Sequence, residues 1–231
     1  MNPSKDAFTS PRAAGFATAA IHDRLARLFE QLGAGLHERD QALRLCLLAA
    51  IAGESVFFLG PPGVAKSLVA RRLQQAFAGA RCFDYLMGRF STPEEIFGPV
   101  SIKRLKDEDL YVRRIEDYLP AADIAFLDEI WKAGPPIQNA LLTALNEKIY
   151  RNGNEEIRLP LKLLIGASNE TAPDESAMAF WDRFLIRLEL QPLRSEAAFR
   201  AMLGDARDPY LDCVAEDQRI ADPGNRQLAC D

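Results

Sequence analysis

The sequence has few of the residues that build metal centres or disulfide frameworks. Among its 231 residues there are two histidines and four cysteines. The cysteines are far apart, with no C-x-x-C pair: Cys46, Cys82, Cys213 and Cys230. This pattern argues against a zinc site or a disulfide framework and favours reduced thiols in the cytoplasm.

Long apolar segments are missing as well. The best apolar run, residues 45–53, lies between Arg44 and Glu54 and is far shorter than the roughly 20 residues that span a bilayer. Residues 1–20 include Lys5, Asp6 and Arg12 and lack the compact apolar centre of a secretory signal. We therefore expect a cytoplasmic protein without a membrane span.

The chain also lacks an excess of positive charge. It has 28 Lys and Arg against 33 Asp and Glu, a net charge of −5. Nucleic-acid binding that is independent of sequence depends on neutralising phosphates, so nucleic acid is not expected as a partner. The composition, 48% hydrophobic and 26% charged, is that of a globular protein, long enough for one α/β domain and a short appendage.

Short apolar runs alternate with helical patterns along most of the chain. Strands are predicted at 55–59, 81–86, 124–128, 161–168 and 185–190. Helices are predicted from about Phe16, and at 39–52, 67–79, 92–97 and 135–148. This alternation predicts a three-layer α/β fold with a parallel sheet. We expect a flexible tail at 1–15, a core at 16–193, and a C-terminal segment at 194–231 without a clear period.

Several local signals mark ends and turns. Thr92, Pro93 and Glu95 form the pattern of a capping box, and Gly98 ends that helix. Residues 100–119 contain two β-like runs about an acidic turn. Residues 148–159 predict a hairpin turning at Asn152-Gly153.

The stretch "GPPGVAKS" is nearly a phosphate-binding loop. It lies between a buried strand and a helix, the context in which such a loop is expected. The N–H groups and dipole of the helix N-terminus favour phosphate, Lys66 would reach the β- and γ-phosphates, and Ser67 would offer its hydroxyl to Mg²⁺. The residues expected to bind the nucleotide are Gly60, Pro61, Pro62, Gly63, Val64, Ala65, Lys66 and Ser67. The alternative is a Gly- and Pro-rich turn before a helix, which the Lys-Ser pair disfavours.

Ala65 departs from the usual pattern, which has glycine before the lysine. With a negative φ the methyl group would cost little and favour the helix. With a positive φ it would strain the loop by about 1 kcal/mol or more. The sequence leaves both alternatives open.

Polar residues follow the later strands. Asp128 and Glu129 end a strand where α/β sheets bind ligands, so Asp128 fits a Mg²⁺ partner and Glu129 a base for the attacking water, although such a pair is often a solvated loop. Asn169 could help to place the water. Arg183 and Arg187 follow a predicted helix, and Arg183 could be an arginine finger on a neighbouring subunit or form a surface salt bridge.

Together these residues resemble the MoxR family of AAA+ ATPases, especially its regulatory ATPase variant A (RavA) branch. The matching segments are "GLHERDQALRLCLLAAIAGESVFFLGPPGVAKSLVARRL", "RFSTPEEIFGPVSI", "IAFLDEIWKAGPPIQNALLTALNE" and "RNG" before "LLIGASNE". The resemblance covers about residues 21–203. It implies an α/β, three-layer P-loop NTPase (AAA+) core with a five-stranded parallel sheet, a helix-2 insert hairpin at 100–118 and a pre-sensor-1 hairpin at 148–159.

The resemblance also implies roles for particular residues. Ala65 is then a family variant, Lys66 and Ser67 bind phosphate and Mg²⁺, and Asn169 is the sensor-1 residue. By the same resemblance Asp128 and Glu129 form the Walker B pair and Arg183 is the finger. Leu36 and His37, in the segment "LHER", would lie near the adenine, and His37 stands where this branch often has tyrosine.

The cofactors implied are ATP or ADP with Mg²⁺. The partners implied are further copies of the chain in a hexamer and a protein client, possibly one with a von Willebrand factor A domain. Residues 103–117 hold five basic and five acidic side chains, so the insert is not a nucleic-acid patch.

The C-terminal segment departs from the family pattern. Family members continue into a helical lid with a sensor-2 arginine, whereas this chain ends at Asp231, so we expect residues 194–231 to be the start of a missing or truncated lid. Two functions remain open: an ATPase that remodels partner proteins, and a nucleotide-binding but catalytically weak assembly module. A small-molecule kinase or GTPase is disfavoured because the N-K-x-D signature is absent.

Overall fold

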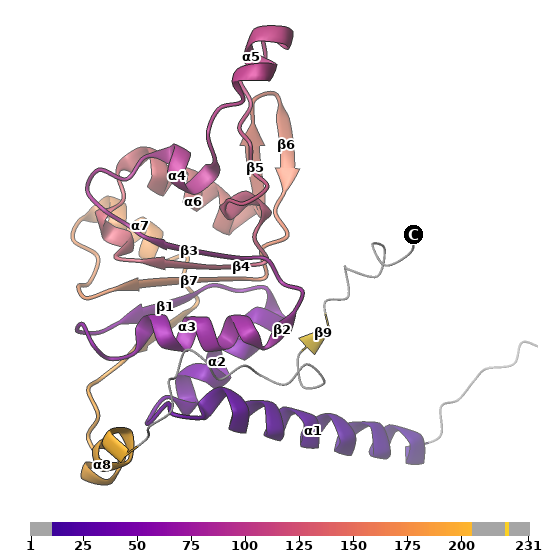
Figure 1. Ribbon diagram of the computed structural model, residues 1–231, viewed down its shortest axis with the longest axis vertical. Helices are drawn as coiled ribbons and strands as arrows, with labels where there is room; N and C mark the ends of the chain where they lie inside the picture. Colours follow the sequence, from indigo (N-terminus) through magenta and orange to yellow (C-terminus); the bar gives the residue numbers. More distant parts are fainter. Residues whose placement is uncertain (1–10, 205–219, 222–231) are drawn as a thin grey trace, which may run out of the picture.

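A five-stranded parallel sheet forms the middle layer of the protein (Figure 1). The computed structural model describes residues 11–204 and 220–221. Along the sheet the strand order is β3-β4-β7-β1-β8. The strands are β1 (Val56–Leu59), β3 (Cys82–Leu86), β4 (Ile124–Asp128), β7 (Leu163–Ser168) and β8 (Ile186–Glu189), and every neighbouring pair is parallel. All five predicted strands and the expected fold class are therefore confirmed.

Helices cover both faces of the sheet. On one face lie α1 (Pro11–Gly33), α2 (Asp40–Ala52) and α3 (Lys66–Gln75), and on the other α4 (Pro93–Phe97), α6 (Pro135–Glu147) and α7 (Glu175–Trp181) (Figure 1). Successive strand residues point to opposite faces, so Phe58 packs into the core beneath α2 and α3, whereas Phe57 packs into the core beside α6 and α7. Burial on both faces explains the continuous apolar runs of β4 and β7.

The helix ends follow the predicted signals in most places. The Glu95 carboxylate accepts the N–H of Thr92 at 2.8 Å, as the capping box requires, and Gly53 ends α2 with a φ of 75°. Short 3₁₀ turns lie at Leu119–Ala121 and Ile130–Lys132. In the part of the chain that is described, no helix has both the length and the apolar character needed to cross a membrane.

Three helices differ from the expectation. Helix α1 begins at Pro11, inside the stretch expected to be a flexible tail. Helix α3 ends at Gln75 because Phe77–Ala78 (β2) pairs with Ile220–Ala221 (β9), a long-range contact that local propensity does not reveal. A helix, α8 (Glu196–Gly204), lies where no period was evident. Residues 1–10 of the expected tail, and residues 205–219 and 222–231 of the C-terminal segment, lie outside the described residues.

The insert between α4 and β4 is only partly a hairpin. Its ends pair through an antiparallel bridge between Val100 and Arg113, but residues Ile102–Glu108 form a helix, α5. The prediction of two β-like runs is wrong for the first run, which is this helix, and the second run contributes one bridge residue, Arg113, and no strand. Ser101 caps the helix by accepting the N–H of Arg104, and the Lys, Arg, Leu and Glu residues that follow are good helix formers.

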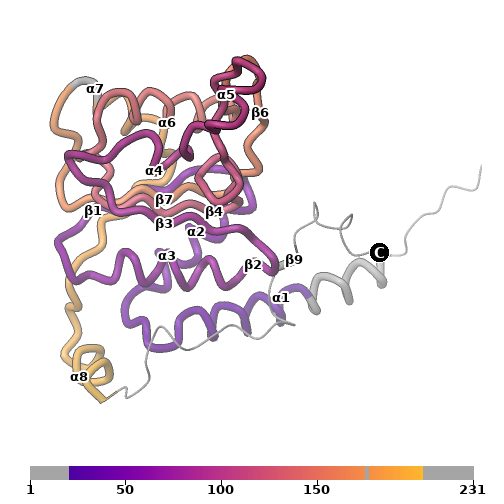
Figure 2. Tube along the Cα trace, turned by 45° about the horizontal axis from the view of Figure 1, so that its top comes forward, coloured from indigo at the N-terminus to yellow at the C-terminus, as the bar shows by residue number. Residues whose placement is uncertain are grey.

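The second addition is the predicted hairpin, formed by β5 (Ile149–Asn152) and β6 (Glu155–Arg158). Its turn lies one residue later than expected, because Asn152 pairs with Glu155 and leaves Gly153 and Asn154 as the loop. Gly153 has a φ of 64°. The insert and this hairpin project together from one end of the sheet (Figures 1 and 2).

Candidate active site

The loop at residues 60–65 connects β1 to α3 at the carboxyl edge of the sheet. Gly60 lies so close to the chain after β8 that an added Cβ would stand 2.3 Å from the carbonyl oxygen of Leu190. Gly63 has a φ of 82°, in the left-handed region. Glycine is thus required at Gly60 by the lack of space and favoured at Gly63 by its left-handed conformation.

Ala65 also adopts a left-handed conformation, with a φ of 66° and a ψ of 28°, directly before α3. Of the two alternatives that the sequence left open, the strained one applies. A methyl group in this region costs about 1–2 kcal/mol relative to an unstrained backbone.

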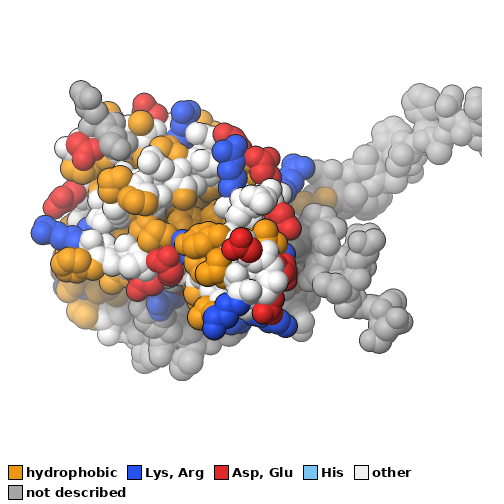
Figure 3. All heavy atoms as spheres, turned by 90° about the horizontal axis from the view of Figure 1, so that it is seen from above, with side chains coloured by type: hydrophobic (Ala, Val, Ile, Leu, Met, Phe, Trp, Pro, Cys, Tyr) orange, Lys and Arg blue, Asp and Glu red, His pale blue; other side chains and the backbone are white. Residues whose placement is uncertain are grey.

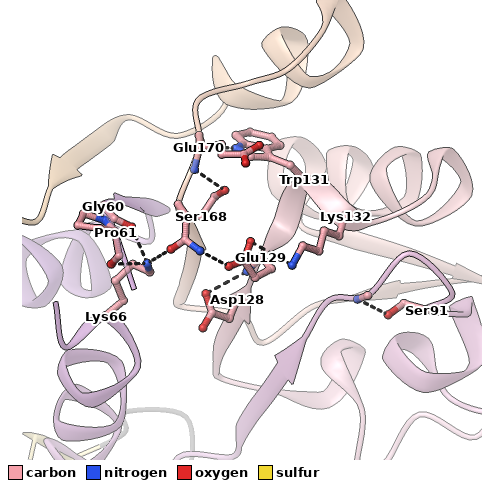
Figure 4. A network of polar contacts seen from close by, with 12 residues as sticks. Gly60, Pro61, Lys66, Ser91, Asp128, Glu129, Trp131, Lys132, Ser168 and Glu170 are labelled. Atoms are coloured by element: carbon pink, nitrogen blue, oxygen red, sulfur yellow. Dashed lines mark hydrogen bonds and ion pairs between the residues drawn. The ribbon is translucent and has the colours of Figure 1, made fainter. Parts of the chain in front are cut away.

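Lys66 is buried and bound on three sides. Its Nζ donates to the carbonyl oxygens of Gly60 at 2.6 Å and Pro61 at 3.1 Å, and to Oδ1 of Asn169 at 2.5 Å (Figure 4). Burial lowers the pKa of Lys66, and the nearby charges of Asp128 and Glu129 act in the opposite direction. Two carboxylates therefore face the ammonium group and favour its charged form.

Asn169 joins this lysine to the carboxylate after β4. Its Nδ2 donates to Oε1 of Glu129 at 2.6 Å, while Lys132 lies 3.6 Å from the other oxygen of that carboxylate. Glu129 has a φ of 52°, and its N–H donates to Oδ1 of Asp128 at 3.0 Å. Two hydrogen bonds through Asn169 thus connect Lys66 to Glu129, although the three residues lie far apart in the sequence.

Two adjoining cavities meet at the loop. A cavity of about 350 Å³ is lined by residues 62–68 together with Asp128, Glu129 and Asn169. A second cavity, of about 470 Å³, shares residues 62–65 and Leu68 with it. Its other lining residues are Gly35, His37, Arg39, Pro192, Leu193, Phe199 and Met202. A polar cavity beside a mostly apolar one has the character that a nucleotide requires, with phosphates in the first and the base in the second.

The residues present also fit a bound Mg²⁺. Ser67 and Asp128 line the same polar cavity. Within residues 11–204 and 220–221 there is no group of three or more His, Cys, Asp or Glu that could hold a metal without other ligands. A Mg²⁺ ion held here by Ser67 and Asp128 would take its other ligands from phosphates and water.

The two residues expected near the adenine differ in position. His37 lines the larger cavity, and its Nε2 is buried with no hydrogen-bond partner among the described residues. Leu36 does not line this cavity and belongs to the apolar core below the sheet. The sequence pattern did not single out Phe199 and Met202, because α8 has no local signal that places it over the loop.

The two arginines after α7 differ in the contacts that their side chains make. Arg187 is held on its own chain: it donates to the carbonyls of Phe184 and Trp181, pairs with Asp182 at 3.2 Å and lies over the Trp181 ring. Arg183 is exposed, and its side chain makes no hydrogen bond or ion pair within the described part of the chain. Neither arginine lines the two cavities.

The chain is similar in sequence to several known proteins. Two uncharacterized proteins of Methanocaldococcus jannaschii, MJ0079 and MJ0812, are each 45% identical to the chain, over 76% and 74% of it. The chain spans about half the length of these relatives, 46% of each. Protein MoxR of Methylorubrum extorquens is 24% identical over 84% of the chain and 57% of that protein.

A solved structure from Cytophaga hutchinsonii, named "putative ATPase", superposes with a TM-score of 0.67 at 17% identity, covering 86% of this chain and 61% of that one. At this identity the likeness shows the fold. One family matches residues 23–219, most of the chain; it is described as the MoxR domain in the MoxR-vWA-beta-propeller ternary systems. By this match the chain belongs to the MoxR family of AAA+ ATPases.

Proposed function

We propose that the chain binds ATP with Mg²⁺ and hydrolyses it, and that it does so in a ring of its own copies to remodel partner proteins. The single observation that carries this proposal is the contact from Lys66 through Asn169 to Glu129 at the edge of a phosphate loop. It joins a phosphate-binding cation, a polar amide and a carboxylate base within one cavity.

Each residue has a role that its contacts support. The acceptors that hold Lys66 are two carbonyl oxygens and an amide oxygen, which phosphate oxygens can replace. Glu129 would accept a proton from the attacking water, and Asn169 would fix that carboxylate in place. Ser67 and Asp128 would hold Mg²⁺, which when bound neutralises charge on the phosphates.

The proposal includes an arginine finger that acts on the neighbouring subunit of a ring. Arg183 is exposed and uncommitted within the described residues, as a group that acts on a neighbouring subunit must be. Arg187, whose guanidinium is held by three groups of its own chain, is the poorer candidate. We therefore assign the finger to Arg183 and expect a homo-hexamer in the cytoplasm.

The proposed client is a protein with a von Willebrand factor A domain. The description of the matching family names such a component beside the MoxR domain. The projecting insert exposes Ile102, Leu105 and Tyr111, and Figure 3, which looks onto this end of the molecule, shows apolar side chains among charged ones. A mixed surface of this kind suits a protein partner. Membership of the RavA-like branch is part of this proposal.

Phosphate release measured with ATP and with GTP, with and without Mg²⁺, tests the activity. We expect release that requires Mg²⁺ and prefers ATP, and the same assay with an added von Willebrand factor A domain protein tests the client. Tight ATP binding without release under any of these conditions would instead identify a catalytically weak assembly module. Preference for GTP, or release that a small-molecule phosphate acceptor accelerates, would contradict the ATPase assignment.

A further inference from the structure

Arg39 connects the phosphate loop to the chain that leads into α8. It lies at the N-terminus of α2 with 6% of its surface exposed. Its Nε donates to the carbonyl of Val64 in the loop at 3.1 Å, and its Nη2 donates to the carbonyl of Gln191 after β8 at 2.6 Å. A third bond, from Nη1 to the carbonyl of Glu38 at 2.8 Å, fixes the plane of the guanidinium. Only the planar fork of arginine can serve three carbonyls in fixed directions.

Glu38, the preceding residue, holds the start of α8. Its two carboxylate oxygens accept the N–H groups of Arg194 and Ser195, both at 2.9 Å. These two bonds are the main cause that lowers the pKa of Glu38. Glu38 has a φ of 57°. A residue other than glycine adopts this backbone conformation only when the surrounding structure holds it there.

The two side chains thus hold two walls of the larger cavity. One wall is the phosphate loop, which Arg39 contacts at Val64; the other carries Phe199 and Met202 of α8, whose first turn follows the residues that Glu38 binds. Two consecutive residues therefore hold both walls. The hydrogen bonds that join Lys66, Asn169 and Glu129 are separate from those of this pair.

We propose that Glu38 and Arg39 are positioning residues that couple occupancy of the phosphate loop to the position of α8. This inference rests on the proposed nucleotide site. When phosphates order the loop, the Val64 carbonyl holds Arg39, and the same guanidinium holds residue 191 and the chain into α8. A brace that only stabilised the fold would hold α8 equally with and without nucleotide.

The test uses the full chain and ADP with Mg²⁺ as the probe. Hydrogen exchange of the amides at 191–204 is measured with and without ADP in the parent, in Arg39→Lys and in Glu38→Gln, and ADP affinity is measured by titration. We expect ADP to slow exchange in the parent. In Arg39→Lys this slowing should disappear and the Kd should rise about tenfold. In Glu38→Gln, whose amide can accept only through one oxygen, the slowing should be reduced, with a smaller change in Kd.

Arg44→Lys is the matched control, because Arg44 lies exposed on the same helix over the Phe29 ring. It should behave as the parent. Glu38 is exposed, so Glu38→Gln keeps the test available should Arg39→Lys fail to fold. If ADP binds to the parent without altering exchange at 191–204, or if Arg39→Lys retains the full effect, the coupling is wrong although the nucleotide site stands. If the parent binds neither ADP nor ATP, the proposed function fails first.

Discussion

The Asn152 side chain forms two hydrogen bonds with the backbone of Arg113, as the backbone of a neighbouring strand would. Its Oδ1 accepts the N–H of Arg113 at 2.6 Å, and its Nδ2 donates to the carbonyl of Arg113 at 3.0 Å. The side chain is buried, and it joins the hairpin to the insert across 39 residues of sequence. At Gly153 an added Cβ would stand 2.8 Å from the carbonyl of Tyr111, so the tip of the hairpin also packs closely on the insert. The two projections are one unit.

Asn152→Ala should therefore loosen the insert. It leaves the part-buried N–H and carbonyl of Arg113 without these partners, which typically costs about 1–3 kcal/mol. We expect a lower melting temperature and faster hydrogen exchange at residues 99–114. Asn154→Ala, at the exposed neighbouring position of the same turn, is the control and should change stability by no more than about 0.5 kcal/mol. Equal effects of the two substitutions would show that the side-chain bonds of Asn152 do not hold the insert.

Ala65→Gly should stabilise the protein by up to about 1 kcal/mol. The substitution removes the strain of a positive φ, and the greater freedom of glycine in the unfolded chain offsets part of this gain. Denaturant unfolding measures the difference. Ala140→Gly, within helix α6, should instead destabilise by about 1 kcal/mol. A loss of stability in Ala65→Gly comparable to that of Ala140→Gly would contradict the left-handed conformation of the loop.

The strands and most residues of the site could be predicted from the sequence, whereas the conformation of the loop could not. The five strands were predictable because each is a short run rich in apolar residues. Lys66 begins the helix after β1, Asp128 ends β4, and Glu129 and Asn169 directly follow β4 and β7. Parallel strands bring such residues to one edge. The conformation of Ala65 was not predictable, because alanine is compatible with either alternative until the loop closes on β8.

Long-range pairing explains the rest of the differences. Arg39 contacts carbonyls 25 and 152 residues away, and backbone carbonyls leave no mark in a sequence. The pairing of β2 with β9 is equally remote. In the insert the error was local: the run at 102–108 suits a helix as well as a strand, and the cap at Ser101 favours the helix.

Lys66→Ala and Glu129→Gln should separate binding from hydrolysis. Loss of the lysine removes a charge-assisted contact with phosphate and should raise the Kd for ATP roughly tenfold or more. In Glu129→Gln the side-chain amide cannot accept the proton of water, so turnover should fall about a hundredfold or more while ATP affinity stays near that of the parent. Nucleotide titration and phosphate release give the two quantities. If Glu129→Gln hydrolyses ATP at the parent rate, Glu129 is not the base.

The assignment of Arg183 is tested by mixing two inactive variants. If Arg183 acts on the site of a neighbouring subunit, Arg183→Ala should lower turnover about a thousandfold while changing ATP affinity little, because a finger stabilises the transition state. Arg27→Ala, which removes another exposed arginine, should leave turnover unchanged. Mixed with Lys66→Ala protein, Arg183→Ala should regain activity, since some interfaces then join an intact Lys66 to an intact Arg183. Native mass spectrometry shows whether the two variants enter the same ring. If the two variants co-assemble and no phosphate release is regained, Arg183 does not act on a neighbouring subunit.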